Sequence, residues 1–115
     1  MKKIEAIIRK SRFEEVRKAL YKVEIHFFTY WDVTGQGNET EAHVYRGVSY
    51  TASDIQRRHI SFVCNNEYAE PAIQAILAAA RTGEVGDGKI FVSEVLESYR
   101  IRTGEQGSVS LKENR

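Results

Sequence analysis

The order in which strand and helix patterns follow one another constrains this chain more than any other feature. Four segments show the alternation or the β-branched and aromatic content of strands, and two carry apolar side chains at helical steps of three and four. The predicted strands cover residues 3–9, 25–33, 59–64 and 89–93, and the predicted helices cover residues 12–23 and 68–81. The order β-α-β-β-α-β predicts an α+β, ferredoxin-like fold, in which two helices cover one face of a four-stranded antiparallel sheet.

Local signals predict where the two helices begin. Ser11 followed by Glu14 has the spacing of a capping box, so we expect the first helix to start near residue 12. Pro71 is compatible with the second helix because the predicted start at Tyr68 places the proline in the first turn.

The predicted second strand is apolar on both faces. Phe27, Trp31 and Val33 lie on one face. Phe28 and Tyr30 lie on the other. Both faces must be covered, which favours an oligomer in a chain this short. The same aromatic residues could form the base-stacking platform of an RNA-binding domain, but the expected Lys/Arg-Gly-Phe/Tyr run is missing, so core and subunit interface are favoured.

Composition and charge exclude several classes of protein. The chain has 115 residues, of which 42% are hydrophobic and 29% charged, and this suits one globular domain. A net charge of +1 gives no general attraction to nucleic acid. No apolar run approaches the ~20 residues of a membrane span, and Glu5 interrupts the stretch that a signal peptide would need. With one cysteine, these features predict a cytoplasmic protein without direct membrane insertion.

Residues 35–55 follow neither the helical nor the strand period. Their first part is polar and their second part is mixed in character. A stretch of this length without regular structure is unusual in a compact domain unless it has a role of its own, so we interpret it as a functional loop.

A glycine-rich turn at residues 82–89 is the first candidate for binding chemistry. Its three glycines allow backbone N–H groups to converge on an anion, and Lys89 adds a positive charge. Ile90 follows the lysine, which excludes a Walker A loop because that motif needs Ser or Thr there. The turn could equally be a helix end followed by a tight turn, so spacing alone leaves phosphate binding and a structural turn equally open.

Two arginines near the C-terminus are the second candidate. In an extended segment, Arg100 and Arg102 point to the same side and could clamp a polyphosphate. Taken alone, a solvated edge with two unrelated charges explains them better. We expect the predicted fourth strand to bring the glycine-rich turn and these arginines to one cleft.

The two candidate segments together match a known family. Residues 82–92 and 100–104 resemble the B-loop and C-loop of the PII nitrogen-regulatory signal proteins, and residues 1–8 resemble their first strand. The loop at 35–55 takes the place of their T-loop. The resemblance therefore covers nearly the whole chain, and it implies that residues 1–115 form a single domain. It implies a compact homotrimer of ferredoxin-like protomers, with nucleotide clefts between subunits in which ATP and ADP compete.

By position, the resemblance also implies which residues hold the nucleotide. The turn at residues 86–89 would hold phosphates through backbone and ammonium groups, and the two arginines would clamp them from the other side. Thr29 and Val63 would line the adenine and ribose, together with glycines of the T-loop. The full implied set is Ile7, Thr29, Gly35, Gly37, Asn38, Glu39, Val63, Gly86, Asp87, Gly88, Lys89, Arg100, Ile101 and Arg102.

The loop departs from the family at the position that responds to 2-oxoglutarate. Glu39 stands where family members have a glutamine that contacts Mg²⁺ and 2-oxoglutarate, and Arg57 replaces a lysine that pairs with 2-oxoglutarate. A carboxylate can ligate Mg²⁺ but repels a dicarboxylate on the same metal. We therefore expect 2-oxoglutarate binding to be weak, altered or absent. The rival interpretation is that Arg57, Mg²⁺ and backbone amides suffice.

The tip of the loop resembles the family motif Tyr-Arg-Gly-Ala-Glu-Tyr. Tyr50 falls on a tyrosine that some members have uridylylated or adenylylated, and Arg46 falls on an arginine that plugs an ammonium-transporter pore. Val48 and Ser49 depart from the motif. An ordinary loop tyrosine and a modified one are about equally supported at Tyr50, and partner contact by Arg46 is the stronger expectation of the two.

Together these features imply a signalling module and not an enzyme. Exchange of ATP for ADP would change how the loop docks on an ammonium transporter or on an enzyme or regulator of nitrogen metabolism. One alternative is a PII-like sensor of adenine nucleotide with another ligand, such as bicarbonate. The other is a phosphoryl-transfer enzyme, for which Asp87 and Glu39 are the only obvious base or metal ligand, and it ranks lowest.

Overall fold

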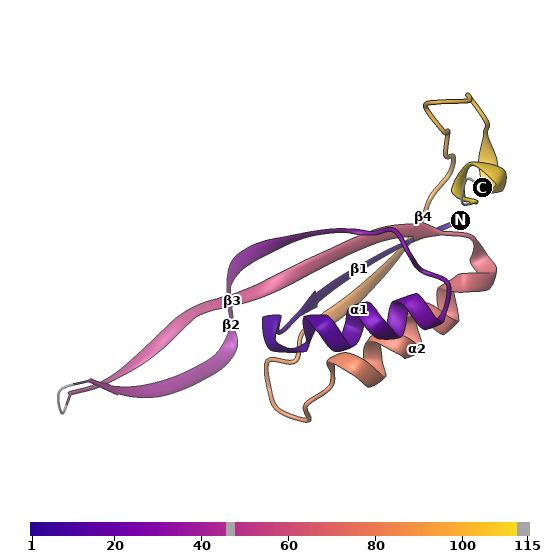
Figure 1. The fold of residues 1–115 in the computed structure, drawn as a ribbon. Coiled ribbons are helices and arrows are strands. Elements are labelled where there is room, and N and C mark those ends of the chain that lie inside the picture. The colour runs from indigo at the N-terminus through magenta and orange to yellow at the C-terminus, as the bar shows by residue number, and fades with distance from the viewer. Residues whose placement is uncertain (46–47, 113–115) are drawn as a thin grey trace.

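The computed structural model describes residues 1–45 and 48–112, and the surroundings of side chains within residues 1–36 and 55–112. The strands are β1 (Lys2–Ile8), β2 (Thr29–Tyr45), β3 (Val48–Cys64) and β4 (Lys89–Glu94) (Figure 1). The helices are α1 (Phe13–Lys22) and α2 (Asn66–Ala80), with short 3₁₀ turns η1 (Lys10–Arg12) and η2 (Gly107–Leu111).

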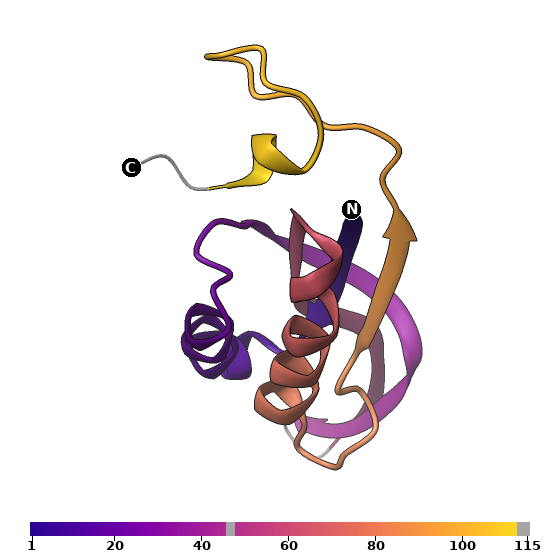
Figure 2. The ribbon, with the colours of Figure 1, turned by 90° about the vertical axis from the view of Figure 1, so that its right-hand side faces the viewer.

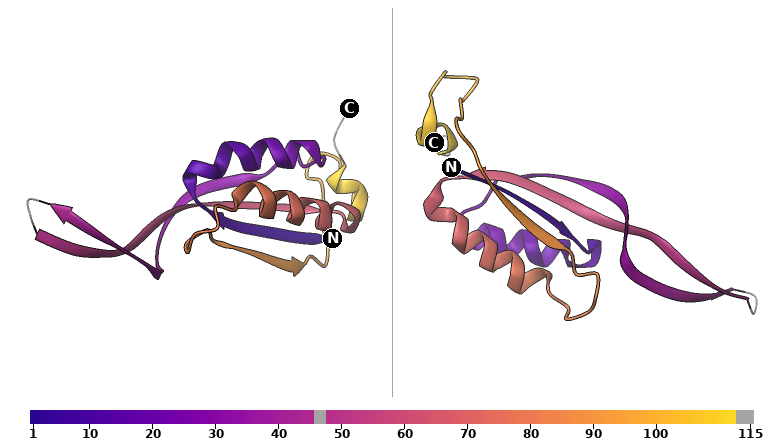
Figure 3. Two further views of the ribbon diagram at one scale, coloured as in Figure 1. Left: turned by 90° about the horizontal axis from the view of Figure 1, so that it is seen from below. Right: turned by 180° about the vertical axis from the view of Figure 1, so that it is seen from behind.

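The four strands form an antiparallel sheet in the order β2-β3-β1-β4. Both helices lie on the same face of this sheet (Figure 3). The predicted ferredoxin-like fold is confirmed.

The core lies between the helices and the covered face of the sheet. The apolar positions predicted to point inward on the first strand, on the third strand and on the first helix are buried there. Alternation along β1 explains the pattern, because every second residue faces the helices. The fully buried large side chains are Phe13, Ile4, Ile8, Leu20, Ile60, Ile76 and Val16.

A long hairpin replaces the loop that the sequence predicts at residues 35–55. β2 and β3 remain paired from Thr29↔Ser61 to Tyr45↔Val48, with an irregular register between Gln36 and Glu41. The hairpin arm, meaning the parts of β2 and β3 beyond Gly35 and Ile55, projects from the body of the protein (Figure 1). The prediction of a stretch without strand structure is therefore wrong. Backbone hydrogen bonds alone can hold a hairpin that does not pack on a core. Its side chains then need not alternate between apolar and polar, so the hydrophobic pattern of the sequence could not reveal these strands.

The second strand also begins later than predicted. Residues 25–28 precede β2, and the Ile25 backbone N–H donates to the Leu20 carbonyl at 2.9 Å. This bond ties the segment to the end of α1 and not to a neighbouring strand. The aromatic content of the segment favoured a strand. The sequence does not reveal the competing backbone hydrogen bond to the end of α1, so the predicted strand began too early.

The predicted helix starts are also wrong in detail. Ser11 lies inside η1, and α1 has Arg12 at its N-cap without a side-chain capping bond, so no capping box forms. α2 begins at Asn66, so Pro71 lies in the helix interior past the first turn. Lys10–Arg12 form a 3₁₀ turn ahead of α1, as is frequent at helix N-termini, and Asn65, a favoured N-cap residue type, precedes α2.

The second face of the sheet is left open by the single chain. Trp31 and Phe91 are 45% and 53% exposed there. The Trp31 and His59 rings stack at 4.3 Å between centroids, and His59 Nε2 lies 2.9 Å from Glu5 Oε2. The prediction that β2 carries apolar side chains on two faces holds at Trp31, whose side chain remains 45% exposed among the described residues.

Replacing Leu20 by alanine should lower the free energy of unfolding by about 2–5 kcal/mol, because the side chain is fully buried and leaves a cavity. Leu96→Ala is the matched control, since Leu96 is 95% exposed and its loss should cost under about 0.5 kcal/mol. Urea unfolding at one fixed protomer concentration measures both. Equal losses in the two variants would contradict this assignment of the core.

Candidate functional site

The glycine loop, residues 82–88, connects α2 to β4 and is organised by one carboxylate. Asp87 Oδ2 accepts hydrogen bonds from the backbone N–H groups of Thr82 at 2.8 Å and Gly83 at 2.9 Å. Asp87 Oδ1 accepts a bond from the Thr82 hydroxyl. These bonds, the Thr82 hydroxyl first, hold the pKa of Asp87 well below its usual range. The carboxylate therefore stays ionised, and keeps its hydrogen bonds to the loop, well below the pH at which an ordinary aspartate takes up a proton.

Two arginines, one just after β1 and one on the neighbouring strand β3, bind the same loop. Arg9, just after β1, places Nε 3.1 Å from Asp87 Oδ1 and donates from Nη2 to the Val85 carbonyl at 2.8 Å. Arg57 on β3 donates from Nε to the Gly86 carbonyl at 3.1 Å. Sequence reasoning missed Arg9. Its position at the end of the first predicted strand, beside the start of the fourth, is the signal that could have found it.

Gly88 lies where the loop passes closest to β1. Its φ is 103°, and a Cβ built there would lie 1.7 Å from the Ile7 carbonyl oxygen. Only glycine fits this position, because both the positive φ and the close approach exclude a side chain. Beside it, a cavity of about 110 Å³ is lined by Ile7, the end of α2, and residues 87–90.

A second group of predicted residues lies in the C-terminal segment. Arg100 Nη1 lies 2.6 Å from Glu105 Oε1, and Arg100 Nη2 donates to the carbonyls of Val109, at 3.2 Å, and Lys112. The Thr103 hydroxyl and the Arg100 charge keep the pKa of Glu105 below its ordinary value. Arg102 and Ile101 are exposed on the same turn.

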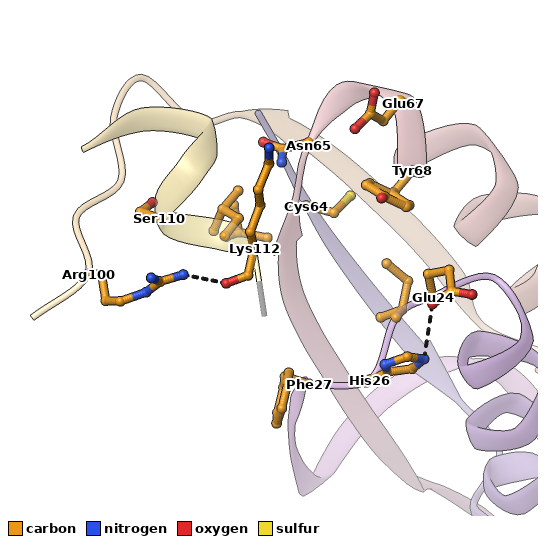
Figure 4. Close-up of a pocket in the computed structure, with 13 residues that line it drawn as sticks. Glu24, His26, Phe27, Cys64, Asn65, Glu67, Tyr68, Arg100, Ser110 and Lys112 are labelled. Atoms are coloured by element: carbon orange, nitrogen blue, oxygen red, sulfur yellow. Dashed lines mark hydrogen bonds and ion pairs between the residues drawn. The ribbon is translucent and has the colours of Figure 1, made fainter. Parts of the chain in front are cut away.

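Two adjoining cavities border this second group. Arg100 and Val63 line a cavity of about 650 Å³ between the C-terminal segment and residues 24–27 (Figure 4). Thr29 and Val63 line a neighbouring cavity of about 740 Å³ along the start of β2. Volumes of this size suit a small-molecule ligand.

Outside the hairpin arm, the predicted site residues fall into two clusters, and Arg9 joins the first of them as a residue that was not predicted. We call the glycine loop with Ile7, Lys89, Arg9 and Arg57 the first cluster. Thr29, Val63 and Arg100 form the second cluster, together with the exposed Ile101 and Arg102 on the same turn.

The two clusters lie at opposite ends of β4. Lys89 at its start pairs with Ile7, and Glu94 at its end pairs with Lys2. The strand has six residues, so its first and last residues lie about 17 Å apart at ~3.3 Å per step. Figure 2 shows the glycine loop and the C-terminal segment leaving β4 in opposite directions. The prediction that β4 brings both to one cleft within a chain is wrong, because an extended strand holds its ends apart.

Several predicted residues lie in or beside the hairpin arm. Gly35 pairs with Ile55, at the end of the sheet that carries the first cluster. Strand β2 contains Gly37, Asn38 and Glu39, and β3 contains Tyr50. The surroundings of these residues lie outside what the structure describes. Arg46 lies outside the described residues altogether.

The described part of the chain offers neither a clustered metal site nor a membrane-spanning helix. Among those residues, no group of three or more His, Cys, Asp or Glu side chains is placed to hold a metal ion. None of the helices within residues 1–45 and 48–112 is long and apolar enough to cross a bilayer.

The geometry defines a ferredoxin-like protein with a hairpin arm and a glycine loop at one end of its sheet. The family model described as Nitrogen regulatory protein P-II matches residues 1–105. The chain belongs to this family of nitrogen regulatory proteins, as the B-loop and C-loop resemblance predicts. Signal transduction in nitrogen regulation is the role that membership supports.

Individual relatives agree with this assignment. Nitrogen regulatory protein P-II of Bradyrhizobium diazoefficiens is 44% identical over 108 residues, which cover 93% of this chain and 96% of the relative. Nitrogen regulatory protein P-II 1 of Methanothermobacter thermautotrophicus is 44% identical over 108 residues, covering 93% and 94%. The P-II protein of Nostoc punctiforme is 42% identical over 109 residues, covering 94% and 97%. All three are named as regulatory proteins.

Gly88→Ala and Gly83→Ala form a matched pair that tests the packing of the loop. Both glycines have a positive φ, so alanine should cost about 1–2 kcal/mol at either position. Only at Gly88 does the new Cβ meet backbone, whereas Gly83 faces open space. We expect Gly88→Ala to lower the free energy of unfolding clearly more than Gly83→Ala in urea unfolding. An equal loss would mean that β1 does not pack against the loop as described.

Proposed function

We propose that this protein is a trimeric signal protein for nitrogen and energy status, which binds ATP or ADP in clefts between subunits. Through its hairpin arm it regulates an ammonium transporter or another protein of nitrogen metabolism. The observation that carries the proposal is the separation of the two clusters. Each is half of a polyphosphate and nucleoside site, and only a neighbouring chain can complete it.

The first cluster supplies the chemistry of a phosphate site. Lys89 brings an ammonium group to the end of a loop whose glycines adopt positive φ, as anion-binding turns require. Asp87 serves as the internal brace of that loop. Its carboxylate accepts from Thr82, Gly83 and Arg9, which argues against the phosphoryl-transfer alternative that would use it as a base.

The second cluster supplies the complementary half. Thr29 and Val63 would face the nucleoside of the neighbour's nucleotide, and Arg100 and Arg102 would clamp its phosphates. The open face of the sheet supports the trimer, since Trp31 and Phe91 are large apolar side chains that the described part of the chain leaves about half exposed.

The hairpin arm is positioned to respond to the nucleotide. Arg57 links β3 to the Gly86 carbonyl, and the irregular pairing between Gln36 and Glu41 interrupts the arm close to the same place. A change at the bound phosphates would therefore reach the arm through the contact between Arg57 and Gly86. In the arm, Arg46 would contact the partner, and Tyr50 would be the residue open to modification.

The response to 2-oxoglutarate is proposed to be weak, altered or absent. By its position in the family motif, Glu39 would bring a negative charge to the place where a dicarboxylate and Mg²⁺ meet. Arg57 already donates to Gly86 and to the Gln56 carbonyl at 2.8 Å, so an added anion must compete for its guanidinium. These observations favour, as a second candidate, an adenine-nucleotide sensor that works with another small ligand such as bicarbonate.

Mixing two inactive variants tests whether the clefts lie between subunits. Lys89→Ala should remove the phosphate charge from the first cluster, and Arg100→Ala should remove the clamp from the second. Each variant alone should lose ATP and ADP binding in calorimetry by at least about tenfold. Equal mixing with exchange of subunits should restore roughly a quarter of the clefts in a cyclic trimer.

Three results would count against the proposal. Wild-type protein that binds neither nucleotide would overturn the function. Wild-type binding without restoration on mixing would place the whole site within one chain. A mass other than that of a trimer in sedimentation equilibrium would remove the cyclic arrangement.

Glu39→Gln tests the cause of the altered ligand response. With Mg²⁺ present, 2-oxoglutarate should leave ATP affinity of the wild type nearly unchanged and should strengthen it about tenfold in the variant, because one repelling charge is gone. Glu41→Gln removes the same charge two residues further along and serves as control. A wild type that already responds fully would show that Glu39 does not block the site.

A further inference from the structure

We propose that the ring of Phe27 is the platform on which the base of the bound nucleotide stacks, and that this residue sets a preference for purines over pyrimidines. This inference rests on the proposed nucleotide function. It gives Phe27 a stacking role towards a free nucleotide, where the sequence alone favoured core or subunit interface over the base-stacking platform of an RNA-binding domain.

The chain holds Phe27 in place without burying it. Ile25 on one side is buried and bonded to the end of α1. Phe28 on the other side packs edge-on against the Phe13 ring at 6.3 Å. His26 turns back toward α1, where its ring lies 4.3 Å from that of Tyr21. Between these anchored neighbours, the Phe27 side chain is 76% exposed.

Phe27 is also shared by both cavities of the second cluster. It lines the cavity that contains Arg100 and the cavity that contains Thr29, and Val63 likewise lines both. Figure 4 shows the Phe27 ring at the rim of the cavity that contains Arg100. Arg100 and Lys112, from the C-terminal segment, border the same cavity. A single exposed phenylalanine is common on protein surfaces, but this one stands where two ligand-sized cavities adjoin.

The chemistry of this place fits a base joined to phosphates. An aromatic face attracts any base by stacking, and the attraction grows with the area of the base. Arg100 supplies a guanidinium for the anionic part of the same molecule, and a phosphate there competes with Glu105 and with the carbonyls of Val109 and Lys112. Phe27 has no polar atom, so it discriminates by ring area and not by hydrogen bonding. An apolar peptide side chain would gain less from this site, because it carries no phosphate for the arginine.

The test compares Phe27→Leu with Phe27→Trp by calorimetry. Leucine keeps apolar volume but removes the ring, and we expect about tenfold weaker binding of both ATP and ADP. Tryptophan keeps a stacking face and should bind at least as well as the wild type. Tyr99→Leu is the matched control, since Tyr99 is 61% exposed, belongs to the same segment as Arg100 and lines neither cavity.

Two other ligands separate stacking from a general change in the site. Inorganic tripolyphosphate has no base, so its affinity should be the same for wild type and Phe27→Leu. UTP should bind more weakly than ATP to the wild type, and Phe27→Leu should reduce that difference.

Each remaining outcome has a definite meaning. Unchanged ATP binding by Phe27→Leu overturns the stacking role and leaves the proposed function standing. Equal loss of tripolyphosphate binding, or equal loss in Tyr99→Leu, also overturns it, because the effect then does not come from the base. Wild-type protein that binds no nucleotide overturns this inference and the proposed function together. Because Phe27 is exposed, all variants should retain the wild-type unfolding transition.

Discussion

The central strand β1 lies between β3 and β4, and most of the molecule depends on its register with these two neighbours. Residues paired across it, such as Ile4 with Phe62 and Val92, face the helices, and the alternate set faces the open side. The same register brings the Ile7 carbonyl against Gly88 and so determines where the glycine loop begins. A shift of one residue would reverse the two faces and separate the loop from its supports.

The glycine loop shows how charge stabilises a turn that has little apolar surface. Asp87 gathers the N–H groups of Thr82 and Gly83, and Arg9 contacts both the carboxylate and the loop backbone. Arg57 adds a bond from β3. The ends of β1 and β3 are thereby connected through one loop. The proposed function requires such a connection, because a change at bound phosphates has to alter the hairpin arm.

The distance between the two clusters explains why the function proposed here needs an oligomer. One chain presents phosphate chemistry at one end of its sheet and a nucleoside-sized pair of cavities at the other. The open sheet face, with Trp31 stacked on His59, offers the surface through which copies could meet. In the proposed trimer, the two-sided strand pattern and the divided site would both follow from this one arrangement.

The sequence by itself determined the order of the elements, the inward residues of β1 and α1, and the family, because hydrophobic period and short motifs are local properties. It also indicated Gly88 and Arg100 as binding residues through their motifs. Only the tertiary structure decided that residues 35–55 continue as strands, that Arg9 braces the loop, and that β4 separates the clusters. Each of these depends on contacts between distant residues or on the length of an extended strand, which local patterns do not record.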